Sequence, residues 1–158
     1  MSQNYIAVLM DTLEKKKDAL QNILRITHEQ EKLAKAEVYQ ESEMEKTLNE
    51  KEIQIARINT LDEGFQSVYD RVRRDVKSQP EQYRKEIERL QELIRECTDL
   101  GNEIMVLEER NRERFGILFA RSKKQYSTSK NKANVAQNYF RTMNNTKIMD
   151  AYFVDKKQ

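Results

Sequence analysis

The sequence predicts an elongated all-α protein, and three observations support that class. Charged residues make up 35% of the 158-residue chain. It contains only three glycines and one proline, whereas an average protein has roughly 7% Gly and about 5% Pro. Apolar residues recur at helical spacing over long stretches. We therefore expect an antiparallel helical hairpin or three-helix bundle over residues 1–121, followed by a partly disordered or short-helical C-terminal tail over residues 122–158.

The first expected helix follows a stripe of apolar residues that begins at Ile6. Their helical spacing keeps one apolar stripe facing the same way for about eight turns. Residues 36–41 then form either a short helix or a corner. The stripe consists of Ile6, Leu9, Leu13, Leu20, Ile23, Leu24, Ile26 and Leu33.

The second expected helix starts at a capping box, in which Ser42 precedes Glu45 by three residues. Two polar residues, Lys51 and Asp62, interrupt its apolar seam, and we expect them to fix the helix register at some cost in stability. If register is the only role of Lys51, replacing it with leucine should stabilise the hairpin. The seam positions are Met44, Leu48, Lys51, Ile55, Ile58, Asp62, Phe65, Tyr69, Val72 and Val76.

A second capping box, Ser78 with Glu81, predicts the start of a third helix with Pro80 in its first turn. Expected lengths are roughly 35 residues for the second helix and over 40 for the third. The short connection between them predicts an antiparallel hairpin, with the first helix packed alongside. Seam positions of the third helix are Tyr83, Ile87, Leu90, Ile94, Cys97, Gly101, Ile104, Asn111, Phe115 and Leu118.

The tail differs from the rest of the chain in charge and in amino-acid composition. Residues 122–158 hold eight basic and two acidic residues, which indicates a separate role. Its apolar residues either bind the amphipathic helix of a partner or fold back as a fourth helix over the hairpin. The candidate partner-binding residues are Tyr126, Val135, Tyr139, Phe140, Met143, Ile148, Met149, Tyr152 and Phe153.

The motifs of common active sites are missing from the sequence. It has no glycine-rich phosphate loop and no helical His–Glu metal motif, and its single histidine, His28, cannot form a histidine cluster. Its lone cysteine, Cys97, fits a small apolar seam position. We expect no enzyme activity, cofactor or metal. With no apolar stretch of 18 residues and no secretory leader, we also expect a cytoplasmic protein without stable membrane insertion.

The segment Thr47-Leu48-Asn49-Glu50-Lys51, with the regularly spaced aliphatic residues after it, resembles the FlgN-type flagellar export chaperones. Two further segments resemble that family's asparagine-rich final helix, namely Asn102–Ile104 and Leu107–Asn111. The resemblance covers roughly residues 5–126.

This resemblance implies a chaperone that holds hook–filament junction (hook-associated) proteins before export and docks them to the export gate of the flagellar type III apparatus. In the family, the tail engages the client's C-terminal helix, and a tail tyrosine followed by glycine contacts the gate. Tyr126 is the nearest match, but Ser127 stands in place of the glycine.

Two other functions stay open at this stage. A structural coiled-coil adaptor or oligomeric scaffold would self-associate through its seams, and the pattern does not decide between a monomer and a homodimer. A nucleic-acid or anionic-membrane binder would use the basic tail. The tail lysines are dispersed among Asn and Ser instead of forming a dense patch, which disfavours nucleic acid as a partner.

Overall fold

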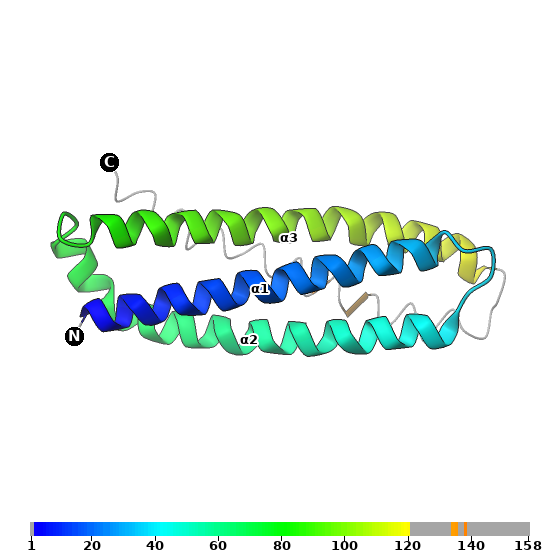
Figure 1. The fold of residues 1–158 in the computed structure, drawn as a ribbon, viewed down its shortest axis with the longest axis horizontal. Coiled ribbons are helices and arrows are strands. Elements are labelled where there is room, and N and C mark those ends of the chain that lie inside the picture. Colours follow the sequence, from blue (N-terminus) through cyan, green and yellow to red (C-terminus); the bar gives the residue numbers. More distant parts are fainter. Residues whose placement is uncertain (1, 121–133, 136–137, 139–158) are drawn as a thin grey trace.

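The computed structural model describes residues 2–120, 134–135 and 138. Residues 2–120 form three α-helices: α1 (Ser2–Ala34), α2 (Glu41–Ser78) and α3 (Arg84–Phe119). They contain 33, 38 and 36 residues, so each is about 50–57 Å long at 1.5 Å per residue. The rod-like shape in Figure 1 confirms the predicted all-α three-helix class. Within residues 2–120, no helix has the length and apolarity needed to cross a membrane.

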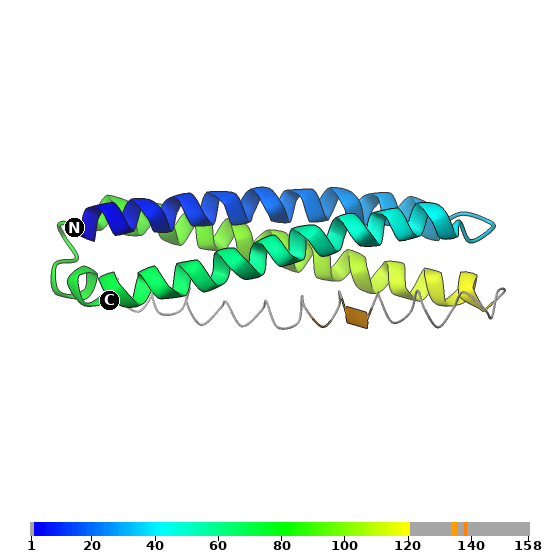
Figure 2. The ribbon, with the colours of Figure 1, turned by 90° about the horizontal axis from the view of Figure 1, so that it is seen from below.

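The helices run up, down and up, and α1 is the central member. α1 packs along both α2 and α3, whereas the backbones of α2 and α3 scarcely approach each other. Figures 1 and 2 show α1 on one side of the layer that α2 and α3 make. The antiparallel α2 and α3 with α1 packed alongside agree with the predicted three-helix unit.

Both predicted capping boxes are wrong. α2 begins at Glu41 with Gln40 at the N-cap, and α3 begins at Arg84 with Tyr83 at the N-cap; neither cap residue makes a side-chain cap hydrogen bond. Ser78 instead ends α2, where its hydroxyl donates to the carbonyl of Asp75 at 3.1 Å. The turn that holds Pro80 therefore extends to Tyr83, and α3 is shorter than predicted. Residues 36–40 form a corner and not a short helix.

Among the described residues, buried apolar side chains gather in three clusters along the rod. The first lies at the α2–α3 turn and includes Leu9, Phe65 and Leu90. A middle cluster contains Leu20 and Ile58 with their neighbours. A third cluster, at the α1–α2 corner, contains Ala34, Met44, Leu48, Phe115, Leu118 and Phe119, with Tyr39 against its edge. Tyr39 meets the Phe119 ring edge-to-face at 4.6 Å between centroids.

Two isoleucines on α2 provide a test of this packing. Ile58 is completely buried in the middle cluster, and Ile53 is exposed on the outer side of the same helix. Ile58→Ala should lower the free energy of unfolding by about 2–5 kcal/mol, whereas Ile53→Ala should change it by less than about 0.5 kcal/mol. Urea denaturation followed by circular dichroism measures both. Equal effects of the two substitutions would contradict the packing described here.

Candidate functional site

The most distinctive chemistry in the described residues is a layer of buried polar side chains, which we call the Lys51 layer. It consists of Thr27, Gln30, Thr47, Lys51, Glu108 and Asn111, all of them buried. All three helices contribute to it. In sequence it lies between residues of the middle cluster and residues of the corner cluster on each of the three helices. A polar layer therefore interrupts the apolar core along the rod.

Lys51 is the centre of this layer and is only 1% exposed. Its ammonium donates hydrogen bonds to Oε1 of Glu108 on α3 and to Oε1 of Gln30 on α1. Gln30 Nε2 in turn donates to Thr47 Oγ1 at 3.2 Å. Burial lowers the pKa of Lys51 from its usual value, while the charge and hydrogen bond of the Glu108 carboxylate oppose part of that shift.

The same layer continues toward α1 through Asn111. Its side-chain Nδ2 donates to the carbonyl of Thr27 at 3.0 Å, and the Thr27 hydroxyl donates to the carbonyl of Ile23 at 2.7 Å. Asn111 Oδ1 is buried without a hydrogen-bond partner in the described part of the chain. Such groups favour one helix register, because a slipped register would leave more of them unpaired in an apolar core.

A second polar interruption lies near the middle of the rod and involves the other predicted seam residue, Asp62. The buried Lys16 of α1 pairs with Asp62 at 2.8 Å, and Asp62 stays partly exposed at the rim. On the α3 side, Lys17 pairs with Glu96 at 3.0 Å. Together these contacts connect α1 to both other helices by charge.

Cys97 lies beside these charges and is buried in the middle cluster. Its thiol is 3.8 Å from the carbonyl oxygen of Leu13, as a weak donor. Burial raises its pKa to about 11 from the ordinary value of 9.0. Lys16 opposes that shift, and Asp62 adds to it. A protonated, enclosed thiol has little nucleophilic character.

The sequence prediction identified Lys51 and Asp62 but missed both of their partners. The predicted seam of α3 passes from Ile104 directly to Asn111, a step of seven residues. Steps of four and three place Glu108 in that gap. The stripe on α1 has an equivalent gap between Leu13 and Leu20, and Lys16 fills it. Missing heptad positions were therefore the signal that could have located both ion pairs.

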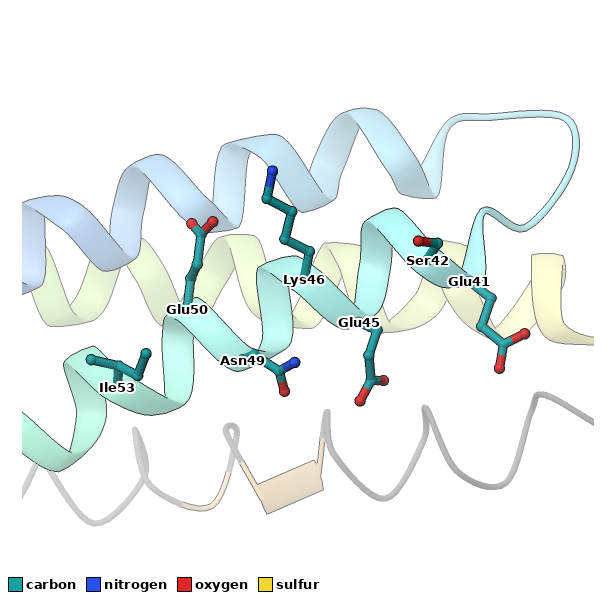
Figure 3. A pocket seen from close by; sticks show the side chains of 7 residues that line it. All are labelled: Glu41, Ser42, Glu45, Lys46, Asn49, Glu50 and Ile53. Carbon is teal, nitrogen blue, oxygen red and sulfur yellow. The ribbon is translucent and has the colours of Figure 1, made fainter.

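The first half of α2 carries a shallow hollow on its outer side, shown in Figure 3. The described residues that line it all come from this one helix, and three of them are glutamates. Glu45 and Asn49 point to the side where residues 134–135 lie, and Lys46 and Glu50 point toward α1. The lining residues are Glu41, Ser42, Glu45, Lys46, Asn49, Glu50 and Ile53.

Of the predicted partner-binding residues, Val135 alone belongs to the described part of the chain. Asn134, Val135 and Asn138 are helical, and the fragment at 134–135 lies on the side of the α2–α3 layer away from α1 (Figure 2). The side chain of Val135 is 65% exposed. The remaining predicted binding residues are outside the described residues: Tyr126, Tyr139, Phe140, Met143, Ile148, Met149, Tyr152 and Phe153.

No family model, curated protein or solved structure matches the chain. Among the described residues, no three or more His, Cys, Asp or Glu side chains come together as a group that could hold a metal ion. Lys51 of α2 and Glu108 of α3 form an ion pair in which both side chains are shielded from solvent. This arrangement of charges is suited to holding the helices in alignment.

The Lys51–Glu108 pair revises the effect expected of replacing Lys51. Lys51→Met should lower the free energy of unfolding by about 3–5 kcal/mol, because it leaves the Glu108 charge buried without its partner. The double variant Lys51→Met/Glu108→Leu removes both charges and should be as stable as the parent chain or up to about 4 kcal/mol more stable. Urea denaturation of the two variants checks this. A single variant as stable as the parent would exclude a buried ion pair.

The burial of Cys97 predicts a protected thiol. At pH 8 it should react with an aromatic disulfide reagent about a hundredfold more slowly in the native protein than in the unfolded chain, because a pKa near 11 leaves little thiolate. The raised pKa favours the folded state at pH values below about 9, and this contribution is lost between pH 9 and pH 11. Absorbance of the released thiolate measures the rate. Equally fast reaction in native and unfolded protein would contradict the burial.

Proposed function

We propose that this protein is a non-catalytic, helix-binding export chaperone of the FlgN type, which acts in the cytoplasm on hook–filament junction proteins before their type III export. In this proposal α1, α2 and α3 form a rigid platform, and the C-terminal region binds an amphipathic helix of the client. Tyr126 would contribute to contact with the export gate.

The observation that carries the proposal is the exposed apolar side chain of Val135. Val135 belongs to a helical stretch on the side of the bundle away from α1 (Figure 2). In sequence, Tyr139 and Met143 follow at intervals of four residues, which on a helix extends the same stripe. A stripe of this kind on a surface helix can be buried by the apolar face of a partner helix.

The affinity expected of such a contact suits a client that must later be released. If about six apolar anchors contribute roughly 1.5 kcal/mol each, ordering the segments takes back about 2–5 kcal/mol. Loss of rigid-body freedom takes back more. The tail alone would then bind with micromolar affinity or weaker.

The structural adaptor is the alternative, and the packing of α2 and α3 argues against its simplest form. That alternative requires the seams Met44–Val76 and Tyr83–Leu118 to bind other chains. Most of the seam side chains are already buried within one copy, including Phe65, Leu90 and Ile104. A second copy would have to use a different surface.

A binding experiment with matched exposed valines tests the proposal. Purified full chain should bind peptides that span the C-terminal helix of a hook–filament junction protein, and Val135→Asp should weaken that binding about tenfold or more. Val38→Asp is the control, because Val38 is at least as exposed as Val135 but lies in the α1–α2 corner. Titration calorimetry measures the affinities, and circular dichroism checks that both variants stay folded. No binding by the parent chain, or equal binding by both variants, would overturn the proposal.

A further inference from the structure

The Lys51 layer divides the apolar core of the rod into two unequal parts. The first and middle clusters lie on one side of the layer, and the corner cluster lies on the other. Among the described residues, the corner cluster holds fewer buried side chains than the first cluster alone. Segments with few buried apolar contacts open at a lower free energy than the whole protein unfolds. The corner part is therefore the one that we expect to open by itself.

At the corner end, α3 is the helix that can separate from the other two. Residues 35–40 join α1 and α2 there, whereas the described part of α3 is held at this end by side-chain contacts (Figure 1). Tyr39 belongs to the connection between α1 and α2. Its ring meets those of Phe115 and Phe119 of α3 edge-to-face, at 6.5 and 4.6 Å between centroids. The Tyr39 ring therefore acts as a clasp on the last turns of α3.

The buried charges of the layer lower the free energy that such an opening needs. Lys51 and Glu108 are 1% and 8% exposed. Burial disfavours the ammonium form of Lys51, and the lowered pKa of this group reflects that cost. When the end of α3 separates, both charged groups regain contact with water. Their rehydration offsets part of the free energy that is lost when the apolar contacts of the corner cluster are broken.

We propose that α3 from Glu108 to Phe119 opens away from α1 and α2 as one unit, with the Lys51 layer as its boundary and Tyr39 as its clasp. The closed bundle is the major form, and the open form is a minor state in equilibrium with it. Opening exposes Leu48 of α2, which belongs to the corner cluster, while Leu90 of the first cluster stays buried. This inference does not depend on the function proposed above.

Thiol labelling at these two matched leucines tests the opening. In the full chain with Cys97→Ala, Leu48→Cys should react with a maleimide at least about tenfold faster than Leu90→Cys, although both positions are buried in the closed bundle. The rate at position 48 should change little in low concentrations of urea, because a local opening exposes little surface. The rate at position 90 should rise steeply with urea, because it requires unfolding of the larger part of the core.

Two sets of substitutions should change the opening in opposite directions. Lys51→Met/Glu108→Leu makes the apolar core continuous, so the rate at position 48 should fall to within about threefold of the rate at position 90. Tyr39→Ala removes the clasp and should raise the rate at position 48 about fivefold or more, with no change at position 90. Circular dichroism checks that each variant is folded. If the double variant does not fold, the result with Tyr39→Ala decides alone.

Three results would overturn the proposal. Equal labelling at positions 48 and 90, with the same dependence on urea, would mean that the corner opens only when the whole protein unfolds. A ratio of the two rates that Lys51→Met/Glu108→Leu leaves unchanged would exclude the Lys51 layer as the boundary. Equal increases at both positions in Tyr39→Ala would indicate a general loss of stability and not the release of a clasp.

Discussion

The structure depends on α1, which has to bury two sides at once. α1 packs along both α2 and α3, whereas the backbones of α2 and α3 scarcely approach each other. Small and branched side chains on α1 suit that position: Ala19, Leu20 and Ile23 have no exposed surface and belong to the cluster that joins Ile58 of α2 to Ile104 of α3. A helix covered on two sides tolerates few polar residues, so each polar residue it does bury requires a partner on a neighbouring helix.

The two buried lysines meet that requirement in the same way. Lys51 of α2 reaches both α1 and α3, and Lys16 of α1 reaches α2. Removing such charges from water costs free energy that their mutual attraction only partly returns, so these pairs contribute more to the choice of register than to net stability. Long helices with repeating apolar stripes need such a device, since a shift by one heptad would otherwise preserve most apolar contacts.

The helix class and the seams could be predicted because both depend on the spacing of apolar residues, which one sequence is enough to show. Eight of the ten seam positions assigned to α2 are buried, and the exceptions, Ile55 and Asp62, are partly buried. Helix ends were not predictable from Ser42 and Ser78, because a capping serine stabilises a helix start by only about 1 kcal/mol and tertiary contacts outweigh it. The short α2–α3 connection predicted their antiparallel direction. The heptad spacing could not show that α1 contacts both other helices while the backbones of α2 and α3 stay apart.

The C-terminal region links the fold to the proposed function through Val135, which is an apolar side chain left exposed. A helix that folds back over the bundle and a helix that binds a partner need not be competing states, since they can use different sides of one segment. An exposed apolar side chain gains free energy when the apolar face of a second helix covers it, and this gain is what the proposed binding of a client would use.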